Sequence, residues 1–150
     1  MSQSLTKLYV HIVFSTKNHV AFIDENIASE LYSYIGGILN KLECPPIKIG
    51  GYHDHIHILC CLSKKITLIK LLQEIKQSSS KWMKTKGGKL QNFFWQDGYG
   101  AFTVSPFHTE NIISYIENQP EHHRKISFKD EYIEFLDECG IDYDLRYVWD

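Results

Sequence analysis

Three histidines and an aspartate lie within five positions of the stretch GYHDHIHILCCLS, in the middle of the chain. His55 and His57 are separated by one residue, so on a β-strand their side chains project from the same face. Two neutral imidazoles at this spacing can share a divalent cation. Burying a histidine without a partner costs free energy. A metal site therefore competes with the simpler interpretation that these histidines are structural residues.

Two imidazoles cannot complete a metal site, so a third ligand has to come from elsewhere in the chain. Imidazole-rich sites suit zinc and other transition metals, whereas Mg²⁺ prefers oxygen ligands. His53 and Asp54 come just before the histidine pair, and we favour a turn there over a role in supporting the ligands. Because imidazoles bind metal in their neutral form, we expect activity at such a site to fall below about pH 6.5.

A tyrosine lies on the polar side of the segment TENIISYIENQPEHH. Tyr115 and Gln119 are four residues apart, so on a helix they share one face. A tyrosine in a polar stripe is commonly a surface or interface residue; the functional alternative is a nucleophile that attacks phosphorus. The ordinary phenol pKa of about 10 leaves few phenolates at neutral pH, so that role needs a nearby cation or base.

Hydrophobic periodicity predicts the elements that carry these residues. The segments KLYVHIVFST, IKIGG and HIHILCCL are typical of strands, and NFFWQ and YGAFTVS predict strands on either side of an Asp97–Gly98 turn. One helix is predicted from about Glu25 to Leu42 after an Asp24 N-cap, and a second after Thr67. A third spans about Thr109 to Gln119, where Pro120 ends or restarts it. A last helix begins at Ser127 and stops at Gly140.

This order of elements predicts an α+β fold: a ferredoxin-like split β-α-β antiparallel sheet with helices on one face and a C-terminal helical extension. The chain has 150 residues, of which 43% are hydrophobic, so we expect residues 1–150 to form a single domain. No apolar run reaches the length of about 18 residues that a membrane span requires. We interpret the N-terminal apolar segment as a first strand and not as a signal peptide.

The charges are unevenly distributed, although the formal net charge is only −2. Residues 64–89 hold eight lysines and one acid, whereas residues 110–150 hold eleven acids and four basic residues. The lysines predict either a phosphate-binding surface or a solvated helix face. We interpret the acidic tail as a folded cover or a dimer contact. We interpret His122–His123 as a solvated pair, with an approach to the metal as the alternative. Four cysteines without a CxxC motif indicate free thiols and a cytoplasmic location.

Five segments in this order resemble the single-tyrosine HUH transposases, the IS200-like insertion-sequence enzymes and their palindrome-associated relatives. The segments are HIVFSTKNH, HIH preceded by aspartate, KLLQEIKQSSSKWMK, FFWQDGYGAFTVS and IISYIENQ, and together they cover nearly the whole chain. HUH denotes two histidines flanking a bulky hydrophobic residue. The His-x-His motif alone is weakly specific, but a downstream Tyr-x-x-x-Gln makes the resemblance strong.

The resemblance implies that His55, His57 and Gln119 bind a divalent metal, Mg²⁺ or Mn²⁺, and that Tyr115 is the nucleophile. Such enzymes nick single-stranded DNA beside a hairpin, form a 5′-phosphotyrosine link and then rejoin strands. They form homodimers in which the tyrosine helix serves the same subunit or its partner. Lys17, together with lysines of the basic segment, would contact the DNA backbone; the lysines in question are Lys76, Lys81 and Lys84.

Two alternatives stay open at this point. A palindrome-processing HUH endonuclease that is not mobile would carry the same catalytic residues. A ferredoxin-like module that binds nucleic acid without catalysis would bind metal or hairpins and form no covalent adduct. The aromatic side chains between Trp82 and Phe102 can stack on flipped bases, but most are expected in the core.

Overall fold

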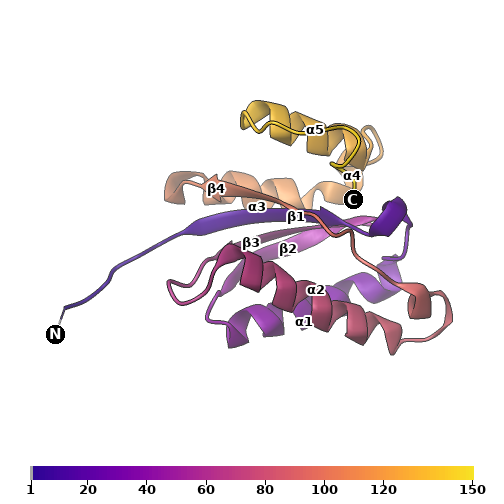
Figure 1. Cartoon of the computed structure of the whole chain (residues 1–150), viewed down its shortest axis with the longest axis horizontal. Helices are drawn as coiled ribbons and strands as arrows, with labels where there is room; N and C mark the ends of the chain where they lie inside the picture. Colours follow the sequence, from indigo (N-terminus) through magenta and orange to yellow (C-terminus); the bar gives the residue numbers. More distant parts are fainter. Residues whose placement is uncertain (1) are drawn as a thin grey trace.

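An antiparallel sheet lies between two layers of helices in the computed structural model, which describes residues 2–150 (Figure 1). Its strands are β1 (Tyr9–Ser15), β2 (Pro46–Tyr52), β3 (His55–Cys61) and β4 (Gly100–Val104), in the spatial order β2-β3-β1-β4. Every neighbouring pair is antiparallel. This arrangement confirms the predicted split β-α-β sheet.

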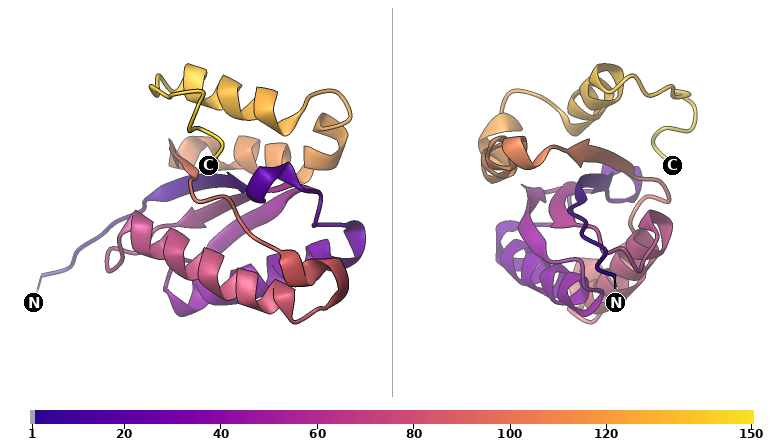
Figure 2. Two further views of the ribbon diagram at one scale, coloured as in Figure 1. Left: turned by 45° about the vertical axis from the view of Figure 1, so that its right-hand side comes forward. Right: turned by 90° about the vertical axis from the view of Figure 1, so that its left-hand side faces the viewer.

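The helices divide between the two faces of the sheet. The helices α1 (Glu25–Lys41) and α2 (Leu68–Lys84) cover one face, and the C-terminal extension covers the other (Figure 2). The extension consists of α3 (Thr109–Glu117), α4 (Gln119–His122) and α5 (Phe128–Glu138). Short 3₁₀ helices complete the described elements: η1 (Lys17–His19), η2 (Gly88–Asn92) and η3 (Pro106–His108).

The predicted helix starts are confirmed by their capping hydrogen bonds. The Asp24 side chain accepts hydrogen bonds from the backbone N–H groups of Asn26 and Ile27 at the start of α1. Thr67 accepts from Lys70 N–H at the start of α2, and Ser127 accepts from Asp130 N–H at the start of α5. Each cap satisfies an amide that the helix itself leaves unpaired, an effect of about 1 kcal/mol.

Alternation along β3 separates the core from the histidines. Ile56, Ile58 and Cys60 are fully buried on the side of α1 and α2, where they join the main hydrophobic core. His55 and His57 project to the opposite face, beneath the C-terminal helices. A smaller core on that face packs α5 against the sheet; its buried residues are Val13, Phe102, Phe128, Tyr132 and Leu136. The same strand therefore stabilises the fold with one face and presents imidazoles on the other.

The strand predicted for NFFWQ is wrong. Within the described residues, this segment makes a single β-bridge, between Thr16 and Trp95, and η2 precedes it. Phe93 and Trp95 are nevertheless buried, and the Trp95 indole N–H donates to Ser79 Oγ at 2.9 Å. The alternation of this segment reflects side chains inserted into the core, and its backbone does not extend the sheet.

The tyrosine helix breaks where the sequence predicted it would. α3 ends at Glu117 and α4 begins at Gln119, which is followed directly by Pro120. Proline has no N–H to donate and its ring crowds the preceding turn, so the chain changes direction at Asn118. The break aims Gln119 at the sheet, where its side chain is fully buried.

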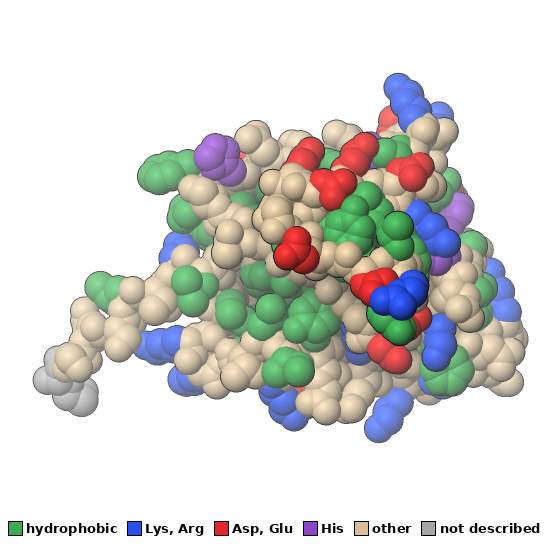
Figure 3. Space-filling view, turned by 45° about the horizontal axis from the view of Figure 1, so that its top comes forward, with side chains coloured by type: hydrophobic (Ala, Val, Ile, Leu, Met, Phe, Trp, Pro, Cys, Tyr) green, Lys and Arg blue, Asp and Glu red, His purple; other side chains and the backbone are tan. Residues whose placement is uncertain are grey.

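The acidic side chains are concentrated on one side of the molecule. Acidic side chains gather on the face that carries the C-terminal extension (Figure 3). The exposed acids of α5 are Asp130, Glu134, Asp137 and Glu138. Among residues 2–150, none of the helices has both the length and the apolar character needed to cross a bilayer.

Candidate active site

The two histidines of β3 are fully buried side by side. Their ring centroids are 5.1 Å apart, and neither side chain is exposed. His55 Nδ1 lies 2.8 Å from Asp54 Oδ1, and His57 Nδ1 lies 2.8 Å from His11 Nε2 of β1. Both rings are therefore fixed through one nitrogen, which leaves Nε2 of each directed at the C-terminal helices.

Tyr115 of α3 and Gln119 of α4 lie against these rings. Gln119 Oε1 lies 2.8 Å from His55 Nε2, and the Tyr115 ring centroid lies 5.6 Å from that of His57. The structure thus brings together, within one chain, the four residues that the sequence singled out for catalysis and metal binding.

A carboxylate that the sequence analysis missed lies at the centre of this cluster. Glu131 of α5 is 1% exposed although it is charged. Its Oε1 lies 3.2 Å from His57 Nε2, and its Oε2 accepts hydrogen bonds from the Tyr115 hydroxyl and, at 3.0 Å, from Gln119 Nε2. Buried carboxylates persist only when they are paired in this way. Glu131 could bind a metal ion together with the histidine pair, because His55, His57 and Glu131 each offer a ligand atom within 4.8 Å of the others.

His123 also belongs to the cluster, so its interpretation as a solvated residue is wrong. Its side chain is 3% exposed, and its Nε2 lies 2.8 Å from Gln119 Oε1 and 3.3 Å from Glu131 Oε1. The turn after α4 folds this residue back over the sheet, where the Tyr52 ring stacks on it with centroids 5.7 Å apart. His122 is more exposed and lies on the Oε2 side of the carboxylate.

Asp54 is both a turn residue and a hydrogen-bonding partner of His55. It sits in the turn between β2 and β3, and it also accepts a hydrogen bond from the ring of His55. Burial would raise the pKa of Asp54, but the contact with His55 outweighs it and lowers the pKa below its ordinary value. An ionised carboxylate on Nδ1 fixes the ring tautomer and makes Nε2 a better ligand.

Burial and hydrogen bonding shift the pKa values of the other groups in the cluster. Burial has the larger effect on the two histidines described first. Burial lowers the pKa of His57 to about 4 and that of His11 to about 3, so both rings are neutral at physiological pH. Burial raises the pKa of the Tyr115 phenol well above its ordinary value, and the Glu131 carboxylate raises it further. For Glu131 itself, hydrogen bonds from His123 and His57 outweigh burial and hold the pKa far below its ordinary value. The cluster therefore combines neutral imidazoles with a carboxylate anion, a donor set that fits a divalent cation.

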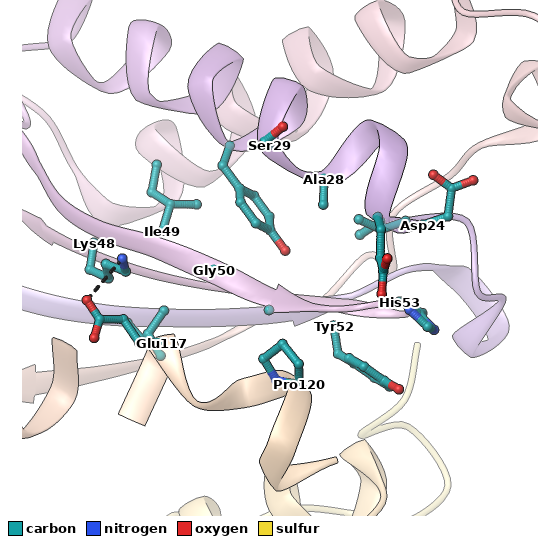
Figure 4. Close-up of a pocket in the computed structure, with 15 residues that line it drawn as sticks. Asp24, Ala28, Ser29, Lys48, Ile49, Gly50, Tyr52, His53, Glu117 and Pro120 are labelled. Carbon is teal, nitrogen blue, oxygen red and sulfur yellow. Dashed lines mark ion pairs between the residues drawn. The ribbon is translucent and has the colours of Figure 1, made fainter. Parts of the chain in front are cut away.

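Close packing of α3 on the edge strand β2 sets the position of the tyrosine. A Cβ atom on Gly50 would lie 2.7 Å from Ile116 Cγ2 and 3.1 Å from Ile116 O. Gly50 pairs with His57 in the sheet, so the glycine lies between the histidine strand and the tyrosine helix. An ion pair of 3.2 Å between Lys48 and Glu117 also joins the two elements (Figure 4). The lack of a side chain at Gly50 lets Tyr115 approach the histidines.

The cavity drawn in Figure 4 is separate from this cluster. It has a volume of about 430 Å³ and lies between α1, the edge of β2 and the break between α3 and α4. Tyr52 and His53 line it, with their rings stacked 4.1 Å apart, and Tyr52 separates it from His123. None of the catalytic candidates lines the cavity.

Comparisons with known proteins agree with this arrangement. The family described as "Transposase IS200 like" matches residues 4–119, which is most of the chain. The chain belongs to the IS200-like transposase family. Gln119 is the last residue of the match, so His123 and Glu131 lie beyond it. No curated protein matches the sequence significantly.

Solved structures share the fold of this IS200-like transposase. A candidate transposase from Deinococcus radiodurans R1 superposes with a TM-score of 0.62 at 21% identity, covering 79% of this chain and 98% of that chain. A REP-associated tyrosine transposase bound to a REP hairpin gives a TM-score of 0.58 at 15% identity, covering 84% of this chain and 76% of that chain. At these identities the likeness concerns the fold.

The four lysines predicted to contact DNA have different surroundings in the transposase. Lys76 Nζ donates to the backbone carbonyls of Gln96, Asp97 and Gly98, at 2.9, 3.0 and 2.6 Å. Lys84 lies over the exposed ring of Phe94, 4.1 Å from its centroid. Lys81 and Lys17 are exposed. Lys76 therefore fixes a loop, whereas the other three have side chains that can reach a ligand.

A groove of about 750 Å³ runs between α2 and residues 94–99. Lys81, Lys84 and Phe94 line it, so it combines positive charge with an aromatic face. The backbone N–H of Lys17 donates to Phe94 O at 2.8 Å, and that of Thr16 donates to Asp54 O at 2.8 Å. Lys17 thus lies between this groove and the turn that orients His55.

Proposed function

We propose that this transposase cuts and rejoins single-stranded DNA beside a hairpin through a 5′-phosphotyrosine link at Tyr115. The observation that carries the proposal is the contact between elements far apart in sequence. Tyr115 adjoins the imidazoles of the same chain, and its hydroxyl shares the Glu131 carboxylate with His57. A structural role for two buried histidines does not require a tyrosine and an amide directed at them from other helices.

In the first step the Tyr115 oxygen attacks phosphorus, the new P–O bond forms and the bond from phosphorus to the 3′ oxygen breaks. The phenol proton leaves, and the released 3′ oxygen ends as a hydroxyl. The reverse reaction, with a 3′-hydroxyl as the attacking group, restores a phosphodiester. One ester replaces another in each step, so no nucleoside triphosphate is consumed, and the sequence contains no P-loop motif.

We assign His55, His57 and Gln119 to a divalent cation, Mg²⁺ or Mn²⁺. When bound, the cation supplies positive charge to the non-bridging phosphate oxygens. Two residues of the chain position the proposed ligands: Asp54 orients His55, and Gln119 contacts both His55 and Glu131. Because the pKa of Tyr115 is raised by burial and by Glu131, the phenol keeps its proton until positive charge offsets the carboxylate.

The groove beside α2 is our proposed path for the DNA backbone. Lys81 and Lys84 would pair with phosphates, and Phe94, which is 53% exposed, would stack on a base. Lys17 would guide the strand from this groove to the histidines. Each neutralised phosphate contributes about −0.7 to the slope of log affinity against log salt concentration for a single strand. The relative bound to a REP hairpin supports a hairpin substrate.

The test uses a labelled single-stranded DNA library with a fixed hairpin and randomised flanks, incubated with the full-length protein and Mn²⁺. Denaturing gels should show a covalent protein–DNA adduct that Tyr115→Phe removes. Tyr147→Phe is the matched control, because this tyrosine is 63% exposed on the C-terminal segment. An adduct that survives Tyr115→Phe would assign the nucleophile to another residue. Hairpin binding without any adduct would favour the non-catalytic module.

Homodimer formation is part of the proposal as well. Sedimentation equilibrium of the purified protein, with and without hairpin DNA, measures the assembly directly. A mass of one chain at all concentrations would contradict a homodimer and leave the cleavage chemistry to a single subunit.

A further inference from the structure

Three ring nitrogens, not two, converge on one point of the active site. The Nε2 atoms of His57, His123 and His55 lie 3.2, 3.3 and 3.6 Å from the same oxygen, Oε1 of Glu131. All three rings are buried: His55 and His57 are fully buried and His123 is 3% exposed. Nothing in the family match accounts for His123, because that match ends at residue 119.

His123 repeats the hydrogen-bonding arrangement of His55. Nδ1 of His55 faces Asp54 Oδ1, and Nδ1 of His123 faces the Ile126 carbonyl oxygen, each at 2.8 Å. Both partners accept hydrogen bonds, so Nδ1–H is the donor in each ring, and Nε2 of each ring is left to face the oxygens of Gln119 and Glu131. A carboxylate or a backbone carbonyl on the second nitrogen is the usual support of a metal-bound imidazole.

Each of these Nε2 atoms faces two oxygens. Nε2 of His55 and Nε2 of His123 each lie 2.8 Å from Gln119 Oε1, and both face Glu131 Oε1 as well. A nitrogen lone pair and an oxygen lone pair repel each other unless a cation or a proton lies between them. A proton or a cation must therefore lie between each Nε2 and these oxygens, and one dication where the three rings meet can take the place of several protons.

We infer that His123 is a third imidazole ligand of the catalytic cation, and that the site prefers a transition-metal dication such as Mn²⁺, Co²⁺ or Zn²⁺ to Mg²⁺. This inference rests on the proposed function, whose ligand set it extends. Three imidazoles supply nitrogen donors, which suit transition metals, whereas Mg²⁺ selects oxygen. Glu131 and Asp54 supply two negative charges near the site, which match a dication buried among neutral rings.

His122 provides a matched comparison next to His123 in sequence. Its side chain is 32% exposed, and its Nε2 faces Glu131 Oε2, 3.2 Å away, on the other side of the carboxylate. No carbonyl or carboxylate fixes its second nitrogen among the hydrogen bonds of the described residues. His122 also offers a ligand atom within 4.8 Å of those of His123 and Glu131. Only His123 faces the carboxylate oxygen that His55 and His57 face, so the geometry points to His123.

Mn²⁺ binding to the metal-free, full-length protein tests the inference by calorimetry, without reference to activity. We expect His123→Ala and His57→Ala each to weaken Mn²⁺ binding by about a hundredfold or more, and His122→Ala to change it by less than about threefold. An excess of Mg²⁺ of about a hundredfold should leave Mn²⁺ bound. If His123→Ala binds as tightly as the wild type, or if Mg²⁺ displaces Mn²⁺, the inference is overturned.

Imidazole ¹⁵N NMR of the wild type with Zn²⁺ needs no variant, so a folding defect of His123→Ala cannot obscure the answer. The Nε2 signals of His55, His57 and His123 should shift together at one equivalent of Zn²⁺, while His122 stays in place. An unshifted His123 signal beside shifted His55 and His57 signals contradicts the third ligand and leaves the proposed function intact. A wild-type protein that binds no divalent metal contradicts the metal-dependent function itself.

Discussion

At the scale of single residues, Glu131 determines the electrostatics of the site. It accepts a hydrogen bond from the Tyr115 hydroxyl and contacts His57, His123 and Gln119. A buried carboxylate of this kind raises the pKa of the phenol and attracts positive charge to the imidazoles. The proposed nucleophile and the proposed metal ligands are therefore electrostatically coupled through one side chain.

Asp54 gives a residue-scale prediction. Asp54→Asn keeps the size of the side chain but removes the charge that fixes Nδ1–H of His55. We expect the rate of adduct formation to fall by about 10- to 100-fold, as for other residues that support a metal-bound histidine. Single-turnover kinetics with hairpin DNA and Mn²⁺ measure this rate, and Asp142→Asn, at an exposed position of the C-terminal segment, is the control. Equal rates for Asp54→Asn and the wild type would show that Asp54 is only a turn residue.

The sequence was sufficient to predict that two pairs of residues each share one face of a regular element. His55 and His57 share a face because a strand alternates, and Tyr115 and Gln119 share a face because a helix repeats about every four residues. Glu131 was not predicted, because which side of α5 faces the sheet depends on tertiary packing around Tyr132 and Leu136. His11 was not singled out either. It shares a face of β1 with Val13, which pairs with His57, so its place diagonally next to His57 follows from the strand register, a non-local property.

At the scale of elements, the contact between β2 and α3 determines how closely the nucleophile approaches. Gly50→Ala would place a methyl group 2.7 Å from Ile116 Cγ2, so α3 must move outward, at a cost of about 1–3 kcal/mol of stability. We expect adduct formation to fall by more than tenfold, roughly the effect of a misplaced nucleophile. Mn²⁺ affinity should fall less than adduct formation, because His55 and His57 stay on the sheet although Gln119 and His123 follow α3 in the chain.

Gly37→Ala is the matched control for that substitution. A Cβ atom at Gly37, inside α1, has nothing within 4 Å, and alanine is the better helix former. Thermal unfolding should show a gain of about 0.5–1 kcal/mol. If Gly50→Ala also leaves stability and adduct formation unchanged, close packing of α3 does not position Tyr115.

The junction of α2 with residues 96–98 gives a second element-scale prediction, about Lys76 and Lys81. Lys76→Met removes three hydrogen bonds to backbone carbonyls, so we expect a loss of about 1–3 kcal/mol in the free energy of unfolding. Lys81→Met, at an exposed position of the same helix, should leave stability unchanged and weaken hairpin binding. Chemical denaturation and fluorescence anisotropy separate the two effects; similar profiles for both variants would contradict the different roles.

The element boundaries show where sequence reasoning succeeds and fails. Capping side chains are local signals, so Asp24, Thr67 and Ser127 marked helix starts correctly. The segment NFFWQ alternates like a strand because Phe93 and Trp95 are buried, yet in the described part of the chain it forms a single β-bridge, to Thr16, and no continuous ladder. Alternating polar and apolar residues indicate which side chains are buried. Whether the backbone pairs with a neighbouring strand is a separate, non-local property.

At the scale of the whole molecule, the buried histidines make stability depend on pH. The pKa of His57 is about 4 and that of His11 about 3 in the folded protein, against about 6.5 when unfolded. Below pH 6.5 the unfolded chain binds protons that the folded chain does not, so the free energy of unfolding falls as pH decreases. For His123, contacts with Glu131 outweigh burial and raise the pKa, which offsets part of this loss.

We therefore expect the metal-free protein to lose stability between pH 7 and pH 5, on the order of 2 kcal/mol for each of the two rings at pH 5. Urea unfolding at a series of pH values measures the loss. His11→Asn should make the dependence shallower, because one of the two neutral rings is removed. Stability that stays constant or rises toward pH 5 would contradict neutral burial of these rings.

The layered architecture explains how one small domain combines these roles. One face of the sheet carries the main hydrophobic core, and the other holds the imidazoles beneath helices that bring Tyr115, Gln119 and Glu131. The C-terminal extension is therefore both a cover and a source of functional groups. Its outer surface is acidic (Figure 3). We therefore expect DNA along the lysine-lined groove beside α2.

The central claim is that Tyr115 of this chain attacks a phosphate bound beside its own buried histidines. The most direct measurement is mass spectrometric mapping of the adduct after protease and nuclease digestion. The account predicts a single modified peptide, containing IISYIEN, with the nucleotide phosphate on Tyr115. A nucleotide on any other side chain, or a DNA product cut without a protein-linked phosphate, would contradict it.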